Sequence, residues 1–437
     1  MVKIEFFDIN FDNEECLFYA GTEVTGTIVL CLKEEKKVNE ILLELKGKAK
    51  TYWTKHSGKS RQHYTDSEPY FCEQFNTEYT HAYGKPKDRV LPAGRHEIPF
   101  AYTLPPVLPS SFEGEFGHCR YTCTATLERP WDFDIVTTKV FTVIGIEDLN
   151  ENNDARETVD ITDSEFEMVS CWRRIGSIHV DLHLAKAGYV PGEKLLVNAT
   201  IRNDSSQTVK GSVAKVKQHI SYRAKSFMGK EGEKEVVNEL VRHEKGSIPA
   251  HGEQKWTSVP LEIPPVPPKL VKCKVVDINY SLQLEVLPGL VVIAPLFIGN
   301  VPLVDRHLYE SVILQPSANG ATAPKNNPPP EARRGSHTIV NPVALKYSFL
   351  PAPTFEESFT GKYDVRESKQ VESQYPDPMF APRYPCYHFT GSSLALGPPP
   401  PPVSASQQAS VTLPPPSTIE IIVEDQDAEN AEKNNDH

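Results

Sequence analysis

The sequence predicts an all-β protein: two tandem immunoglobulin-like β-sandwiches followed by a long, disordered, proline-rich tail. Apolar and polar residues alternate in short runs through the first three hundred or so positions, which is the period of half-buried strands. Two proline-rich landmarks recur in the same order about 150 residues apart, which indicates an internal repeat. The composition then changes, because 21 of the 38 prolines fall between Asn300 and His437.

The first block covers residues 1–147 and contains only strand-like patterns. After a turn at Tyr19–Glu23, alternate residues from Val24 to Leu32 are apolar or glycine, and the pattern returns in ILLELKGKAKTYW from Ile41. Residues 54–90 are polar, rich in His, Lys and Tyr, and without a clear period. We therefore expect a long hairpin loop there.

The segment Leu91–Arg120 is the landmark that repeats. Pro92-Ala93-Gly94 forms a turn, apolar residues alternate up to Leu104, and Pro105-Pro106 then ends the strand. A second copy begins at Ile248, has Trp256 where the first has Phe100, and ends in IPPVPP at 263–268. Each sandwich should therefore contain this strand and its proline corner.

Residues 148–170 are acidic and polar, and we interpret them as a linker or hinge between the sandwiches. The second block, 171–303, begins with alternation from Ile178 to Leu184. The turn Tyr189–Glu193 then matches Tyr19–Glu23, since in both a Tyr precedes a Glu by four positions. A near-continuous apolar run, Leu290–Ile298, predicts a buried closing strand.

The composition of residues 304–437 predicts a disordered proline-rich tail with an acidic end. Proline runs lie at 328–330, 398–402 and 414–416, and apolar content is low. Such a composition cannot bury enough apolar surface to offset the loss of chain entropy on folding.

Charge and composition exclude several classes of protein. A net charge of −12 argues against nucleic-acid binding, and the longest apolar stretch, Leu287–Gly299, is short and broken by prolines, so we expect only peripheral contact with membranes. We see no secretory signal in MVKIEFFDIN. The eight scattered cysteines then predict reduced thiols in the cytoplasm.

No pattern of catalytic residues or metal ligands is present. The sequence lacks Gly-x-Ser-x-Gly, a Walker-type phosphate loop, His-Glu-x-x-His and a glycine-rich dinucleotide fingerprint. Cys119 and Cys123 lie four positions apart on one strand, too far from each other for a zinc pair, and Cys123 is better explained as a small core residue. We expect neither an enzyme nor a cofactor.

The sequence motifs of residues 1–303, in their order along the chain, resemble those of the arrestin superfamily, and within it those of the α-arrestins, or arrestin-domain-containing proteins. The matching segments are YAGTEVTG at 19–26, GKAKTYW at 47–53, LPAGRHEIPF at 91–100, LPPVLPSSFEGEFGHCRY at 104–121, RPW at 129–131, GYVPGEKLLVNATIRNDSS at 188–206 and IPPVPPKL at 263–270. The resemblance implies that the two sandwiches are the arrestin N and C domains. It also implies a cytosolic, non-enzymatic adaptor that binds cytoplasmic tails of membrane-protein cargo and links them to ubiquitin ligases and endosomal sorting.

The tail departs from that family in one respect. Relatives carry Pro-Pro-x-Tyr motifs that the WW domains of ubiquitin ligases bind, and this sequence has none. Three shorter forms keep one proline and an aromatic residue: Pro353 with Phe355, Pro382 with Tyr384, and Pro385 with Tyr387. They are either weakened WW-domain ligands or mere aromatic positions in a disordered tail.

Two further tail segments have functional interpretations. The β-branched residues Ile419, Ile421, Ile422 and Val423, flanked by acids, resemble a SUMO-interacting motif that binds by strand addition. The alternative is a chance β-prone patch, or a strand that docks on its own sandwich. Ser336 follows Arg333-Arg334 and would suit a basophilic kinase, although an unmodified basic segment fits equally well.

The function predicted from the sequence is a cytoplasmic trafficking adaptor that is recruited to the plasma membrane and endosomes. The alternative is a proline-rich signalling scaffold, whose tail binds SH3-type or WW domains without promoting ubiquitination of cargo.

Overall fold

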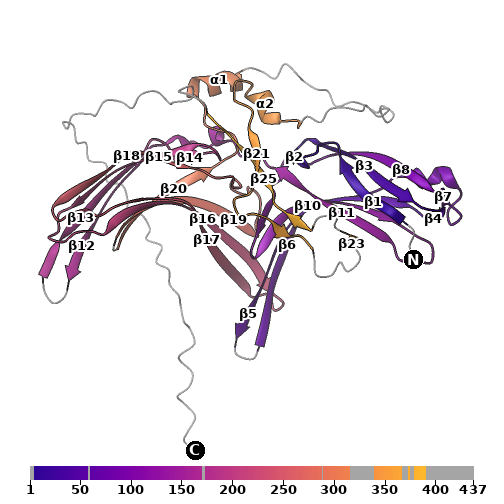
Figure 1. The fold of residues 1–437 in the computed structure, drawn as a ribbon, viewed down its shortest axis with the longest axis horizontal. Coiled ribbons are helices and arrows are strands. Elements are labelled where there is room, and N and C mark those ends of the chain that lie inside the picture. The colour runs from indigo at the N-terminus through magenta and orange to yellow at the C-terminus, as the bar shows by residue number, and fades with distance from the viewer. Residues whose placement is uncertain are drawn as a thin grey trace, which may run out of the picture. The chain divides into compact units, whose positions relative to one another are not determined.

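The computed structural model describes residues 4–57, 60–169, 173–287, 289–314, 339–366, 373–374 and 378–389 (Figure 1). Strands account for nearly all of its regular structure, and they build two successive sandwiches. The predicted all-β class and the tandem organisation are therefore confirmed.

The first sandwich packs a three-stranded sheet against strands of a larger one around a common apolar core. The smaller sheet consists of β1 (Ile4–Phe11), β3 (Glu23–Leu32) and β8 (Gly94–Thr103). The facing strands are β2 (Leu17–Tyr19), β5 (Ile41–Ser57), β6 (Ser60–Asn76), β9 (Phe112–Gly114), β10 (Gly117–Leu127) and β11 (Ile135–Ile144). A short pair and one 3₁₀ helix complete it: β4 (Lys36–Lys37), β7 (Val90–Leu91) and η1 (Tyr79–Tyr83).

The second sandwich repeats this plan after a connection that contains two 3₁₀ helices, η2 (Leu149–Glu151) and η3 (Asp154–Arg156). Its four-stranded sheet consists of β12 (Val159–Val169), β13 (Arg173–Leu184), β15 (Lys194–Asn203) and β18 (Gly252–Glu262). The facing strands are β14 (Gly188–Tyr189), β16 (Gly211–Ser226), β17 (Glu231–Lys245), β19 (Val276–Leu287) and β20 (Leu290–Ile298).

Strand β10 shows why the sequence builds a sandwich. Every second residue from Cys119 to Leu127 is buried, because successive side chains of a strand point to opposite faces. The ring of Tyr121 fills space left by Gly47 on the neighbouring strand β5, where a Cβ atom would lie 2.6 Å from a ring carbon. Cys123 is a core residue, as predicted, and Cys119 on the same face of the strand is also buried.

The two repeated landmarks occupy equivalent places. Tyr19 ends a short strand that pairs in parallel with β11, opposite Ile144, and Tyr189 ends one that pairs in parallel with β20, opposite Ile298. In each sandwich, the strand that follows the Tyr19 or Tyr189 turn pairs with the proline-landmark strand: β3 pairs with β8, and β15 pairs with β18. The internal repeat is therefore a repeat of structure.

Residues 54–90 do not form the long loop that their polarity predicted. Most of them extend strands β5 and β6 into a hairpin, in which Trp53 stacks on Tyr64 with ring centroids 5.5 Å apart. Strand β6 then pairs with β16 of the second sandwich, at Thr65 and Tyr64 (Figure 1). Much of the hairpin is exposed, so its sequence lacks the apolar alternation of a half-buried strand.

The acidic segment 148–170 is also more ordered than predicted. Residues Val159–Val169 form β12, which pairs with β13 over its whole length. Val159 and Ile161 pack against the core while polar residues alternate with them, so only the part before Val159 connects the domains.

The structure differs from the predicted disordered tail in its described segments after 304. These contain α1 (Arg306–Leu314), α2 (Pro342–Lys346), β21 (Thr354–Glu357), β22 (Tyr363–Asp364), β23 (Ser373–Gln374), β24 (Met379–Phe380) and β25 (Arg383–Cys386). Between them, the stretches 339–366 and 378–389 bury several large side chains: Val343, Tyr347, Val365, Tyr384 and Tyr387.

Replacing Trp256 with Ala should destabilise the second sandwich by about 3–5 kcal/mol, because it removes a fully buried aromatic ring and leaves a cavity. The indole Nε1 also donates to Ser212 Oγ at 3.0 Å. The free energy of unfolding in urea measures the effect. Trp131→Ala is the matched control, since this ring is wholly exposed and its loss should cost within about 0.5 kcal/mol. Equal losses for the two variants would contradict the assignment of Trp256 to the core.

Candidate functional site

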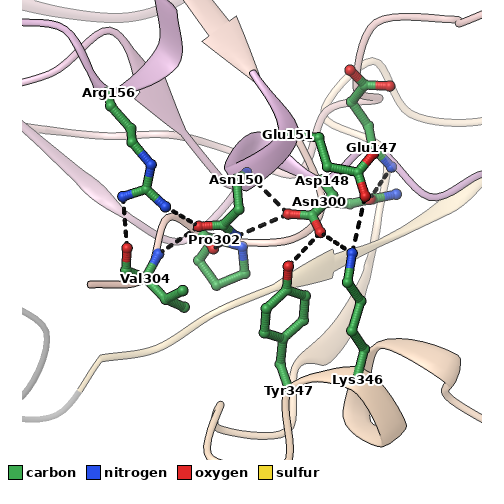
Figure 2. A network of polar contacts seen from close by, with 10 residues as sticks. All are labelled: Glu147, Asp148, Asn150, Glu151, Arg156, Asn300, Pro302, Val304, Lys346 and Tyr347. Carbon is green, nitrogen blue, oxygen red and sulfur yellow. Dashed lines mark hydrogen bonds and ion pairs between the residues drawn. The ribbon is translucent and has the colours of Figure 1, made fainter. Parts of the chain in front are cut away.

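The candidate site is the junction between the two sandwiches together with the tail segments that dock on it. We call its polar part the junction network; Figure 2 shows its ten residues, Glu147, Asp148, Asn150, Glu151, Arg156, Asn300, Pro302, Val304, Lys346 and Tyr347. They come from three places in the chain: the connection after β11, the end of the second sandwich, and the C-terminal end of helix α2 in the tail with its C-cap residue Tyr347.

Asp148 lies at the centre of this network, with a side chain only 4% exposed. Its Oδ1 accepts hydrogen bonds from the backbone and side-chain nitrogens of Asn150, at 2.9 and 2.8 Å. Its Oδ2 accepts from Tyr347 Oη at 2.6 Å and from Lys346 Nζ at 2.9 Å (Figure 2). Burying a carboxylate is costly unless it is paired and hydrogen-bonded, and here the tail supplies two of its four hydrogen bonds.

The second arm of the network connects the interdomain segment to the end of the second sandwich. Asn150 Oδ1 accepts from Val304 N at 2.9 Å and from Arg156 Nη2 at 2.6 Å, while Arg156 Nη1 donates to Val304 O at 2.7 Å. Asn150 Nδ2 also donates to Pro302 O at 2.8 Å (Figure 2). The side chain of Asn150 therefore forms hydrogen bonds both with Asp148 and with the backbone of residues 302–304.

Glu147 and Asn300 make the third contact of the junction. The backbone N–H of Glu147 donates to Asn300 Oδ1 at 2.7 Å, and the Asn300 backbone N–H donates to Glu147 O at 3.0 Å. Burial raises the pKa of the Glu147 carboxyl to about 7; Lys269 opposes this shift, and the nearby acids Glu151 and Asp148 add to it.

Asp148 raises the pKa of both Lys346 and Tyr347. Burial alone would lower the pKa of Lys346, but hydrogen bonds to Asp148 and Glu151 raise it above its ordinary value. The pKa of Tyr347 is raised by burial and by its hydrogen bond to Asp148. Lys346 therefore stays positive and Tyr347 stays a donor at neutral pH, as the buried carboxylate requires.

Strand β25 of the tail pairs with β21 and buries the ring of Tyr384. In this antiparallel pair Tyr384 lies opposite Glu356 and Pro385 opposite Phe355. The Tyr384 hydroxyl donates to Ser111 O of the first sandwich at 2.9 Å, and Arg383 pairs with Glu15 at 3.1 Å. The pair is thus held against the first sandwich by contacts far apart in sequence.

Tyr387, three residues further on, is bound to the second sandwich. Its backbone N–H donates to Pro191 O at 2.9 Å, and its hydroxyl donates to Asn300 O at 3.1 Å. Gly192 makes this approach possible: its φ is +83°, and a Cβ there would lie 2.6 Å from the Tyr387 carbonyl oxygen. Residues 383–387 therefore connect the two sandwiches, and we call them the tail clasp.

A buried ion pair of the first sandwich holds another part of the tail. Arg120 Nε and Nη2 donate to the two carboxylate oxygens of Glu113, both at 2.7 Å, and Arg120 Nη1 donates to Val365 O at 2.9 Å. Burial raises the pKa of Glu113, although Arg120 opposes that shift. The third guanidinium nitrogen thus donates to the backbone of the tail.

Four of the predicted WW-ligand residues lie inside this arrangement: Pro382, Tyr384, Pro385 and Tyr387. Phe355 is half-buried, with its ring 6.4 Å from that of Tyr19, and Pro353 is partly exposed. The expectation that all six stand in a disordered tail is wrong, because both tyrosines are buried and hydrogen-bonded to the sandwiches. The phosphorylation candidate Ser336 and the SUMO-motif residues Ile419, Ile421, Ile422 and Val423 lie outside the described residues.

The junction network could not be predicted from the sequence. Asp148 lies in a segment whose composition predicts a linker, and Lys346 and Tyr347 lie in one whose composition predicts disorder. One local signal was present in NPVALKY at 341–347, where Asn341 is a helix N-cap and Pro342 a first-turn proline. Asn341 Oδ1 indeed accepts from Val343 N at 2.9 Å. This signal predicts a short helix but not its binding site.

Across the ranges that the structure describes, no three His, Cys, Asp or Glu side chains are grouped so that they could hold a metal ion. In those same ranges, no helix has the length and apolar character needed to cross a membrane. The polar groups of the junction bind one another and the tail, so the site is a contact surface.

Comparison with known proteins gives a consistent result. The family model described as "Arrestin (or S-antigen), N-terminal domain" matches residues 7–150, and the corresponding C-terminal domain model matches 174–303. The chain is 42% identical to Arrestin domain-containing protein 17 of Caenorhabditis elegans over 426 residues, which cover 89% of this chain and 100% of the relative. It is 26% identical to human Arrestin domain-containing protein 4 over 302 residues, 67% of this chain and 70% of that protein.

Replacing Asp148 with Asn should loosen helix α2, because Lys346 loses its buried counter-charge. We expect the 341–350 amides to exchange with deuterium at least about fivefold faster, since a lost hydrogen bond to a charged group costs about 1.5–3 kcal/mol. Glu151→Gln is the matched control: Glu151 also pairs with Lys346, but its side chain is 65% exposed. If both variants exchange like the wild type, Asp148 does not anchor the tail.

Proposed function

The chain belongs to the arrestin family of adaptors, as an arrestin domain-containing protein, and from this premise we propose that it links membrane-protein cargo to ubiquitin ligases and endosomal sorting. Both arrestin domains are represented in the chain, and family membership fits a non-enzymatic role. We propose that the protein works in the cytoplasm and is recruited to the plasma membrane and endosomes. Cytoplasmic tails of membrane proteins bind the sandwiches as cargo.

One observation carries the proposal: the tail is docked on both sandwiches and on the junction between them. The clasp touches Ser111 of the first sandwich, Pro191 of the second and Asn300 of the junction. A change at the junction therefore acts directly on the tail. An adaptor needs such a coupling, because recruitment of the ligase should depend on whether cargo is bound.

The WW-ligand residues provide a chemical basis for this coupling, because the docked clasp buries two of them, Tyr384 and Tyr387. A WW domain binds prolines and a neighbouring aromatic ring in an exposed, extended segment. In the docked clasp the Tyr384 and Tyr387 rings are buried, so in our proposal WW-domain ligases bind only after the clasp is released. Cargo that alters the junction network shifts the equilibrium toward release.

Two tail segments supply further proposals that rest on sequence alone. Phosphate on Ser336, beside Arg333-Arg334, regulates the tail by changing its charge. The segment at Ile419–Val423 binds SUMO by adding a strand to it.

The test releases the clasp without touching its own residues. Gly192→Val places a branched side chain against the Tyr387 backbone and should undock residues 383–387. We measure binding of a panel of ligase WW domains to the wild-type chain, to the variant and to a peptide of residues 374–391. We expect binding to the peptide and to the variant, and at least about tenfold weaker binding to the wild type.

Gly229→Val is the matched control, because its φ of +78° adds the same backbone strain where nothing lies within 4 Å of the new Cβ. This control should bind WW domains as the wild type does. A peptide that binds no WW domain at high micromolar concentration would overturn recruitment through these residues.

The adaptor role itself is tested in cells by proximity labelling with a chain that ends at Leu314. This end keeps residues 300–304, which bind Asn150, but it removes Lys346 and Tyr347. The truncated chain therefore also carries Asp148→Asn, so that no carboxylate is left buried without its partners, and full-length Asp148→Asn is the control. An adaptor truncated there keeps its membrane-protein neighbours and loses ubiquitin ligases. Loss of all neighbours would instead support the proline-rich scaffold.

A further inference from the structure

The turn between β16 and β17 exposes two large apolar side chains at its tip. Phe227 is 103% exposed and Met228 is 88% exposed. Two adjacent apolar side chains held entirely in water are unusual for a soluble surface and indicate a binding function. We call Phe227 and Met228 the apolar tip.

The turn is a defined structure and holds the apolar tip outward. The Ser226 backbone N–H donates to Lys230 O and the Gly229 N–H donates to Ser226 O, both at 2.8 Å. Ser226 Oγ also accepts from the Lys230 backbone N–H at 3.1 Å. Gly229 has a φ of +78°, which closes the turn with little strain. The rest of the turn therefore does not cover Phe227 and Met228, and both side chains stay in contact with solvent.

Basic side chains surround this tip. Arg223, Lys225 and Lys230 flank it, and residues 223–230 contain no acid. The acids that follow on β17 pair with two of these cations, Glu231 with Lys225 and Glu233 with Arg223, both at 3.3 Å. These pairs are exposed, so they exchange readily with other anions.

A second hairpin adds to this charge. Strand β6 pairs with β16 at Lys225 and Ser226, so the β5–β6 hairpin lies beside the apolar tip (Figure 1). It contributes the exposed cations Lys55 and Arg61, and residues 54–65 contain no acid. The half-exposed ring of Tyr52, whose hydroxyl bonds His63 Nδ1 at 2.9 Å, lies on the same hairpin.

A second exposed aromatic loop has the opposite charge. Between β10 and β11, Trp131 and Phe133 are 103% and 76% exposed, but the loop also contains Glu128, Asp132 and Asp134. The pKa of Glu128 is raised by burial and by the neighbouring carboxylates Asp134 and Glu40. An anionic surface would repel this loop, so the two tips differ in charge at similar exposure.

We propose that the apolar tip and its basic border form a docking site for an anionic lipid bilayer. Phe227 and Met228 enter the boundary between headgroups and acyl chains, and Arg223, Lys225, Lys230, Lys55 and Arg61 bind lipid phosphate and carboxylate groups. The binding is peripheral and reversible, since two side chains bury little apolar area. This site deepens the proposed recruitment to membranes, and it needs neither cargo nor a ligase.

The experiment uses the purified full chain and vesicles in flotation assays. We expect binding to phosphatidylcholine vesicles that contain about 30% phosphatidylserine, and none to phosphatidylcholine alone. Binding should weaken as NaCl rises above about 0.1 M, where charges are screened beyond roughly 10 Å. F227S/M228S should weaken binding at least about tenfold, and K225E/K230E about fivefold or more for each charge changed.

W131S/F133S is the matched control, because it removes equally exposed aromatic rings from an acidic loop, and it should bind vesicles as the wild type does. Thermal unfolding verifies that each variant is folded. Failure of the wild type to bind anionic vesicles would overturn the proposal, as would unchanged binding of F227S/M228S or equal loss in W131S/F133S. Such a result leaves the adaptor proposal intact, because the assay contains only this chain and lipid.

Discussion

The arrangement of the junction depends on one buried carboxylate, that of Asp148. A charge inside a protein must be paired and hydrogen-bonded, and leaving such a group without its partner costs several kcal/mol. Asp148 receives two hydrogen bonds from Asn150 and two from the tail, through Lys346 and Tyr347. The tail is therefore needed where the domains meet. The same Asn150 binds the end of the second sandwich, so connection, second domain and tail form one cooperative unit.

Prolines have two different roles in this chain. In the sandwiches, the proline pairs Pro105-Pro106 and Pro264-Pro265 follow β8 and β18, where residues without an N–H end a strand. In the clasp, Pro385 lies within β25, and Tyr384 and Tyr387 on either side of it are buried. A segment whose composition suits an exposed ligand for WW domains is here an internal ligand of its own protein. In the proposed function, docking of the clasp and recruitment of a WW-domain ligase therefore compete for the same residues.

The sandwiches could be predicted from the sequence because their signals are local. Alternation from Tyr121 to Leu127 predicts a half-buried strand, and the matching turns at Tyr19 and Tyr189 indicate the repeat. The β5–β6 hairpin was missed because much of it is exposed, so its sequence has no apolar period. The junction was missed because its bonds join residues far apart in sequence: Lys346 and Tyr347 lie 198 and 199 positions from Asp148. Composition predicts what a segment does alone, whereas the described tail segments pack on surfaces that other parts of the chain provide.

Hydrogen exchange of the wild-type chain tests the docked clasp most directly. The Tyr387 amide donates to Pro191 O, an acceptor in the second sandwich, so its protection reports docking rather than local structure. We expect the Tyr387 amide to exchange at least about a hundredfold more slowly in the chain than in the free 374–391 peptide. Exchange at the same rate in the chain and in the peptide would contradict it.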